Sequence, residues 1–214
     1  MFELPSSSIV NKVIPKNSFD KFISNKQKKQ LTEYIDKIKW TNKLSAETIN
    51  LEGSGVKEIQ LFEIVLKKKE INEDILNLVD KSIPYHIIFI LIAEGQYLVS
   101  TAQKHMHPIR LNTSVIDWRF NSNWNDLKNF TFTINLKQSL DDVFTDLCLQ
   151  IIGKEISLKL NLPEIIAKEH KIKQLNFEAS RLEAAIRNIK QFNTKVELNT
   201  RLQSILKELT LIDL

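Results

Sequence analysis

The sequence predicts an α+β fold: a mostly antiparallel or mixed sheet of about six strands with flanking helices, followed by a C-terminal long-helix extension with coiled-coil spacing. Two observations support this prediction. Over residues 1–153, strand-like stretches and shorter helical stretches alternate, and turn residues join the strands mostly as hairpins. After Pro163 there is neither glycine nor a further proline, which favours helix. We therefore expect an α+β domain over residues 1–153 and a helical arm over residues 154–214.

The first predicted helix begins at Asn25, whose side chain is suited to capping a helix N-terminus. We expect this helix to continue to about Ile38, because Leu31, Ile35 and Ile38 would then lie on one face. The segment before it contains two prolines and is expected to be irregular.

A hairpin is predicted over residues 46–67. Residues 48–51 and 56–67 have the β-branched and aliphatic composition of strands. The glycine-rich stretch at residues 53–55 between them is typical of a turn.

The centre of the domain combines a short helix with a second hairpin. Residues 72–81 carry apolar side chains at helical spacing, with acids in the first turn. The almost wholly apolar residues 85–93 predict a central strand buried on both faces. A turn after this strand leads into a second strand, so we expect a hairpin over residues 85–103.

Two further strands and a helix complete the predicted domain. Apolar and polar residues alternate over residues 116–120 and again over residues 130–136, as in half-buried strands. Ser139 followed three positions later by Asp142 matches a capping-box pattern. We expect a helix from there to about Ile151, with its apolar residues facing the core.

Two apolar stripes with coiled-coil spacing run along the arm, and the segment QFNTKVELN at residues 191–199 separates them. The stripes are Leu175, Ala179, Leu182, Ile186 and Ile189, and then Leu198, Leu202, Ile205, Leu209 and Ile212. In one straight helix the second stripe would be rotated by roughly 200° from the first. Either the helix is straight and different neighbours bury its two halves, or the chain turns near Asn193 into a helical hairpin. The absence of glycine and proline favours the straight helix.

The interruption is interpreted as a junction that specifies an assembly. Polar groups at packed positions of helical interfaces set register and partner choice. The candidate partner and register residues are Gln191, Phe192, Asn193, Val196, Asn199 and Leu202. The alternative interpretation is a solvent-facing stretch without such a role.

The net charge of +4 is unevenly distributed along the chain. Residues 1–50 and 154–214 have net charges of +4 and +3, whereas residues 51–153 have −3. If the basic ends share a face, they will attract phosphates or an acidic partner. The candidate contacts are Lys12, Lys16, Lys43, Arg187, Lys190 and Lys195. The lysine runs at residues 26–29 and 67–69 are by themselves typical of solvated surface.

The composition favours a cytoplasmic globular protein. Hydrophobic residues make up 43% of the chain, which is enough for a sizeable core. The longest apolar run, residues 87–93, is far shorter than the roughly 20 residues of a membrane span, and no secretory signal is recognisable. The single Cys148 excludes an internal disulfide and suits a reducing compartment. No P-loop, Rossmann glycine pattern or nucleophile elbow is present in the sequence.

No metal site or cofactor is predicted from the histidines. His105 and His107 stand two positions apart before Pro108, but nothing in the sequence indicates a third ligand. A surface loop explains the same pattern.

One arrangement of acids resembles the metal-dependent nucleases of the restriction type. These enzymes place an acid on one strand and an acid and a lysine two positions apart on the next, so that the carboxylates hold Mg²⁺. Here Glu52 precedes Glu58, but Gln60 stands in the position of the lysine. Lys43 or Lys67 would have to supply the missing cation in this alternative.

Several segments together resemble the uncharacterised bacterial domain-of-unknown-function family numbered 4391, over nearly the whole chain. The segments are residues 4–16, 43–51, 58–67, 83–91 and 190–199. The resemblance implies a genomic context beside DNA methyltransferases and helicases, in loci that resemble restriction or phage-defence systems. It brings no catalytic residues with it. The positions to which it draws attention are Lys16, Lys43, Asn50, Glu58, Lys104 and the segment at residues 191–199.

Together these features predict a non-catalytic accessory subunit of a DNA-modification or phage-defence complex. The helical arm would bind a methyltransferase or helicase subunit, or a second copy of the chain, and the basic residues would contact nucleic acid. The alternatives are a Mg²⁺-dependent nuclease built on Glu52 and Glu58, and a purely structural homodimer.

Overall fold

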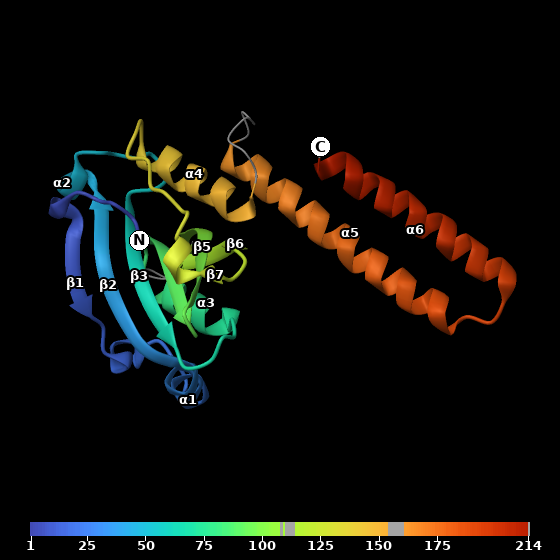
Figure 1. Ribbon diagram of the computed structural model, residues 1–214, viewed down its shortest axis with the longest axis horizontal. Coiled ribbons are helices and arrows are strands. Elements are labelled where there is room, and N and C mark those ends of the chain that lie inside the picture. Colours follow the sequence, from blue (N-terminus) through green and yellow to red (C-terminus); the bar gives the residue numbers. More distant parts are fainter. Residues whose placement is uncertain (108, 110–113, 154–160, 214) are drawn as a thin grey trace. The chain divides into compact units, whose positions relative to one another are not determined.

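A computed structural model describes the chain except for residues 108, 110–113, 154–160 and 214 (Figure 1). The chain divides into two compact units, Met1–Leu158 and Lys159–Leu214. Each unit has a hydrophobic core of its own.

The first unit is built on a seven-stranded mixed sheet, which confirms the predicted α+β fold. Strands β1 to β6 lie in the order of the sequence, and the short β7 pairs with β5. Their bounds are Ile9–Val13, Ile35–Ser45, Glu58–Leu66, His86–Ala93, Gln96–Met106, Ser114–Asn121 and, for β7, Asn125–Asp126. Every pair of neighbours is antiparallel except β3 and β4, which are parallel. The helix α3, Glu73–Ser82, makes the crossover that this parallel pair requires.

Helices cover both faces of the sheet. On one face α1 (Asn25–Tyr34) and α3 enclose the main core, which includes Leu31, Ile38, Phe62, Ile64, Val79 and Phe89. On the other face lies α4, Leu140–Ile152, where the rings of Phe144 and His86 are 4.6 Å apart. The small α2, Ala46–Ile49, and three 3₁₀ turns complete the unit. The turns are Ser6–Ser8, Lys16–Phe19 and Leu127–Asn129.

The first helix is shorter than predicted, because Ile35 and Ile38 belong to β2. Both side chains are buried in the same core, although residues three apart on a regular strand point to opposite faces. A register shift between Ile35 and Lys37 explains this, since an extra residue in one strand reverses the alternation of faces. Because of this bulge, two buried residues of β2 are three positions apart, a spacing that is typical of one face of a helix.

The predicted strand at residues 48–51 is wrong, and so is the hairpin over residues 46–67. A capping box between Ser45 and Thr48 starts α2 there, and Asn50, with φ of 52°, ends it. The antiparallel partner of β3 is β2. The strand predicted at residues 56–67 is confirmed as β3.

The strand predicted over residues 130–136 is also wrong, although its alternation has a structural cause. Phe130 and Phe132 pack on the ring of Tyr97, with centroid distances of 4.7 and 6.1 Å. The backbone N–H groups of Thr131 and Thr133 donate to side-chain oxygens of Tyr97 and Gln150, not to a neighbouring strand. The segment is extended and half-buried without joining the sheet. The predicted elements α3, the β4–β5 hairpin, β6 and α4 are confirmed.

The second unit is a helical hairpin. Helix α5, Leu162–Asn188, and helix α6, Phe192–Asp213, lie side by side and run in opposite directions (Figure 1). Their shared core consists of Leu175, Ala179, Leu182, Leu202 and Ile205. No helix in the described ranges is long and apolar enough to cross a membrane.

The straight helix favoured from the sequence is therefore wrong. Ile189 takes an extended conformation, with φ of −83° and ψ of 130°, and ends α5 without glycine or proline. Folding back at residues 189–191 brings the two out-of-phase stripes face to face, so that each buries the other.

Candidate functional site

A polar cluster lies at one end of the sheet, where Lys43 on β2 meets Glu58 and Gln60 on β3. Lys43 is the cross-strand partner of Gln60, so the three side chains share a face. Lys43 Nζ lies 3.2 Å from Glu58 Oε2, and Gln60 Nε2 donates to Glu58 Oε1 at 2.6 Å. Glu58 and Gln60 are each only 7% exposed. In the restriction-type pattern a lysine would stand at the position of Gln60. Here the cation next to Glu58 is Lys43, from the neighbouring strand β2.

The pKa of Lys43 is raised by its hydrogen bond to Glu58 and by the Coulomb attraction of that carboxylate, with a smaller contribution from Glu47. Partial burial acts in the opposite direction but does not prevail. Lys43 is therefore a stable cation at neutral pH and is unsuited to act as a general base.

The loop that leads to this cluster is held by the carboxylate of Asp141 at the N-terminus of α4. Its oxygens accept hydrogen bonds from the backbone N–H groups of Ser54, Gly55 and Val56 at 2.6, 2.9 and 3.0 Å. Burial would raise the pKa of Asp141, but these donors outweigh it and hold the pKa below its ordinary value. Gly53 has no room for a side chain, because a Cβ there would lie 2.3 Å from the carbonyl oxygen of Val56.

The described residues contain no group of three His, Cys, Asp or Glu side chains that could hold a metal ion. Glu58 is also already engaged by Lys43 and Gln60. The cluster is a charge-balanced polar site in which Glu58 and Gln60 are buried and Lys43 is half-buried.

The sequence matches a protein-family model over nearly its whole length. A family model described as a domain of unknown function, DUF4391, matches residues 2–209. The chain belongs to the DUF4391 family. The match runs through both units, so the helical hairpin is part of the family domain. Comparison with curated proteins and with solved structures gave no match.

In this DUF4391 protein, no contact among the interactions of the described residues joins Glu58 to Lys67 or Glu52, the two other residues of the nuclease hypothesis. Lys67 follows the opposite end of β3, roughly 30 Å along the strand, and its Nζ donates to the carbonyl oxygen of Thr32. Glu52 is exposed in the loop, and its carbonyl oxygen accepts a hydrogen bond from the N–H of Leu140. Of the residues named for this hypothesis, the structure brings together Lys43 and Glu58.

Lys104 belongs to a buried charge cluster of the DUF4391 fold that the sequence did not predict. Its ammonium group donates to Asp80 Oδ1 at 3.1 Å and to the carbonyl oxygens of Asp80 and Ile83 at 2.8 Å, at the C-terminus of α3. Arg119 bonds the other oxygen of Asp80 and also contacts Asn77. These contacts tie α3 to β5 and β6 and assign Lys104 a structural role. The sequence feature that could have indicated this cluster is Asp80, an acidic residue among the buried apolar residues of α3.

His86 and Cys148 are buried, and burial shifts the pKa of each. Burial, with the nearby positive charge of Lys104, lowers the pKa of His86 to about 4, so its imidazole is neutral at physiological pH. Burial raises the pKa of the Cys148 thiol well above its usual value, which makes it a poor nucleophile.

The basic residues singled out from the sequence fall in both units. Lys12 is exposed on the edge strand β1, whereas Lys16 Nζ donates to the carbonyl oxygen of Ile35 at 2.6 Å. Arg187, Lys190 and Lys195 are exposed around the turn of the hairpin.

The partner and register residues also lie at this turn and along the first turns of α6. Phe192 and Val196 are 76% and 47% exposed, and Gln191, Asn193 and Asn199 are exposed as well. Leu202, 8% exposed, belongs to the hairpin core. The polar residues of the interruption are therefore outside the seam between α5 and α6.

Proposed function

We propose that this DUF4391 protein is a non-catalytic accessory subunit that binds a partner protein through its helical hairpin. The observation that supports the proposal is the apolar surface which the hairpin leaves open after closing its own core. Phe177, Phe192 and Leu211 are 72%, 76% and 72% exposed. Phe177 lines a groove on the hairpin, whereas Phe192 and Leu211 lie at opposite ends of α6. A partner that packs on Phe177 would cover an otherwise exposed apolar ring.

The chemistry around Phe177 fits a protein interface. A surface groove of about 610 Å³ follows the flank of the hairpin. Its lining consists of Gln174, Phe177, Glu178, Arg181, Leu182 and Ala185 from α5 with Leu198 and Arg201 from α6. Leu182 is buried and Ala185 and Leu198 are half-buried, whereas Phe177, Arg181 and Arg201 are exposed. Apolar and charged side chains thus stand together in the groove, as they do in interfaces that accept an amphipathic helix.

The partner in this proposal is a methyltransferase or helicase subunit of a DNA-modification or phage-defence complex in the cytoplasm. The family resemblance suggests these partners. The exposed cations Lys12, Arg187, Lys190 and Lys195 are in positions to contact nucleic acid or an acidic surface of such a complex.

Co-purification of the full chain with the adjacent methyltransferase and helicase subunits tests the proposal. Phe177→Ser is expected to weaken capture at least tenfold, because it removes the largest exposed apolar side chain that lines the groove. Val13→Ser is the matched control, since Val13 is an exposed apolar residue, 52% exposed, in the other unit. Equal capture of Phe177→Ser and the unsubstituted protein would refute the docking role of the groove.

A second copy of the chain is the other occupant to be measured. Light scattering of the purified protein alone gives its molar mass. If the protein is a dimer and Phe177→Ser is a monomer, a second copy of the chain, and not a partner subunit, occupies the groove.

The second candidate function is the divalent-metal nuclease, and the contact between Lys43 and Glu58 favours it. An acid at the start of β3 and a cation from β2 meet at one end of the sheet, which supplies one carboxylate and the cation of the restriction-type arrangement but not its second carboxylate. Incubation of the protein with duplex DNA, single-stranded DNA and RNA in Mg²⁺ or Mn²⁺ tests it. Cleavage that Glu58→Gln abolishes and Glu63→Gln retains would establish the nuclease, because Glu63 lies on the opposite face of β3. Inactivity of the unsubstituted protein on all three substrates would eliminate it.

A further inference from the structure

Two lysine runs that are far apart in the sequence come together at one end of the first unit. The N–H of Lys67 donates to the carbonyl oxygen of Tyr34, and Lys67 Nζ donates to that of Thr32, both at 2.9 Å. These bonds fix the run at residues 67–69 against the C-terminal turn of α1. The run at residues 26–29 lies on α1 itself. We call this area the lysine surface, and it comprises Lys21, Lys26, Lys28, Lys29, Lys67, Lys68 and Lys69.

The lysine surface concentrates the charge of the protein. Residues 20–35 and 67–70 contain seven lysines and three acids, an excess of four that equals the net charge of the whole chain. All seven lysines are exposed. Lys28 and Lys29 face Asp20 and Glu33, and Lys69 lies over the ring of Trp124. Lys21, Lys26 and Lys68 make no ion pair with the described residues, so their charges are available to a ligand.

The type of cation indicates how the surface would recognise a polyanion. Neither segment contains arginine. Lysine ammonium groups act as compact point charges on phosphates, whereas paired readout of base edges usually requires the planar arginine fork. Such a surface suits the sugar–phosphate backbone and does not select a base sequence.

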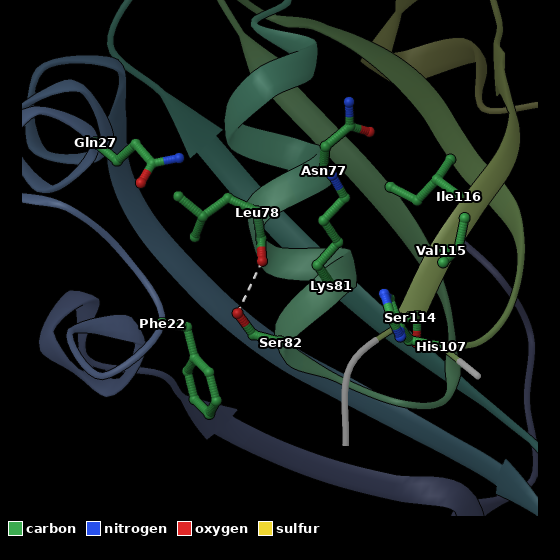
Figure 2. A pocket seen from close by; sticks show the side chains of 10 residues that line it. All are labelled: Phe22, Gln27, Asn77, Leu78, Lys81, Ser82, His107, Ser114, Val115 and Ile116. Atoms are coloured by element: carbon green, nitrogen blue, oxygen red, sulfur yellow. Dashed lines mark hydrogen bonds between the residues drawn. The ribbon is translucent and has the colours of Figure 1, made fainter. Parts of the chain in front are cut away.

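An exposed aromatic ring directly follows Lys21 in the chain, four residues before Lys26. Phe22 follows Lys21, precedes α1 and is 55% exposed. It borders a hollow of about 530 Å³, in which Figure 2 shows Phe22 and Gln27 on one side of α3 and Ser114 and Ile116 on the other. An exposed ring next to phosphate-binding cations provides a platform on which an unpaired base can stack.

We propose that the lysine surface binds single-stranded nucleic acid, with the lysines on successive phosphates and a base stacked on Phe22. A duplex would satisfy the lysines but not Phe22, because its bases are already stacked. The proposal goes beyond the accessory function, since it requires no partner protein and uses different residues.

Fluorescence anisotropy with a labelled oligothymidylate and with a duplex of equal length tests the proposal on the full chain. Two lysines that contact phosphates contribute a combined salt slope of about 1.4, so Lys26→Gln with Lys68→Gln should reduce the slope of log K against log salt by that amount. Phe22→Ala should weaken binding about tenfold without changing the slope, because it removes a base stack and no charge.

The matched control is Lys137→Gln with Lys207→Gln, which removes the same charge from exposed positions outside the lysine surface. This double variant should bind as the unsubstituted chain does. The proposal fails if the control loses as much affinity as the variant of the lysine surface. It also fails if Phe22→Ala binds normally while the duplex binds as tightly as the single strand, or if the unsubstituted chain binds neither at low salt.

Discussion

Lys104 on β5 and Asp80 on α3 form an ion pair in the interior of the first unit, with 3.1 Å between Nζ and Oδ1 and side chains 1% and 0% exposed. Arg119 contacts the same carboxylate, so one buried anion is shared by two cations. Burial lowers the pKa of Lys104, although the attraction of Asp80 opposes this. The backbone carbonyls at the C-terminus of α3 supply the remaining acceptors.

Removing the anion from this cluster should destabilise the protein strongly. Asp80→Asn leaves Lys104 and Arg119 without their counter-charge, and breaking a buried pair in this way typically costs about 3–5 kcal/mol. Urea unfolding measures the loss. Asp74→Asn, at an exposed position in the first turn of the same helix, should cost less than about 1 kcal/mol. Similar losses for the two variants would contradict the structural role of the cluster.

The buried His86 predicts a loss of stability in mild acid. Its pKa is about 4 in the folded protein and 6.5 in the unfolded chain, so the unfolded chain binds the proton more readily between these values. The contribution of His86 to stability should therefore be constant above about pH 7 and fall by about 3 kcal/mol as the pH decreases from 6.5 to 4. His86→Gln should remove most of this decrease in stability, and an unchanged pH dependence in that variant would contradict the prediction. Asp141, whose pKa is lowered, titrates in a more acidic range and does not account for it.

The loop before β3 should not tolerate a side chain at Gly53. In Gly53→Ala the added Cβ would overlap the backbone of Val56 and the carboxylate of Asp141. We expect a loss of about 1–3 kcal/mol in urea unfolding, typical of an overpacked site. Ser54→Ala retains the backbone N–H that Asp141 accepts and should be nearly neutral. A neutral Gly53→Ala would show that the loop is not anchored as described.

Substitutions in the packed seam between α5 and α6 should reduce the stability of the hairpin more than substitutions near its turn. Leu202→Ala opens a cavity between α5 and α6 and should reduce the stability of the hairpin by about 2–4 kcal/mol. Val196→Ser changes an exposed residue and should stay within about 0.5 kcal/mol. Hydrogen exchange of the α5 and α6 amides in the full chain distinguishes the two effects. Comparable changes in exchange for both variants would contradict the assigned packing.

The sequence predicted long or strongly patterned elements well, and it failed where a local irregularity changed the pattern. The apolar β4 and the capped α3 and α4 followed directly from composition and spacing. The bulge near Ile35 gave buried residues of a strand the spacing of a helix. The packing of Phe130 and Phe132 on Tyr97 gave a segment outside the sheet the alternation of a strand. A register shift and a stacking contact both depend on tertiary partners, which a single sequence does not specify.

The candidate sites likewise depend on contacts between segments that are distant in the sequence. Glu58 was recognisable from its position on β3, but its contact with Lys43 depends on the register of two strands. The lysine runs were visible in the sequence as separate solvated stretches. Their convergence depends on the hydrogen bonds that Lys67 makes to the end of α1.

The most direct test of the accessory role is hydrogen exchange of the full chain, alone and in the presence of the methyltransferase and helicase subunits. A docking hairpin predicts slower exchange along residues 174–185 and 198–201, where the groove lies. Exchange in β2 and β3 around Lys43 and Glu58 should not change. Unchanged exchange throughout α5 and α6 in a complex that forms would contradict the central claim.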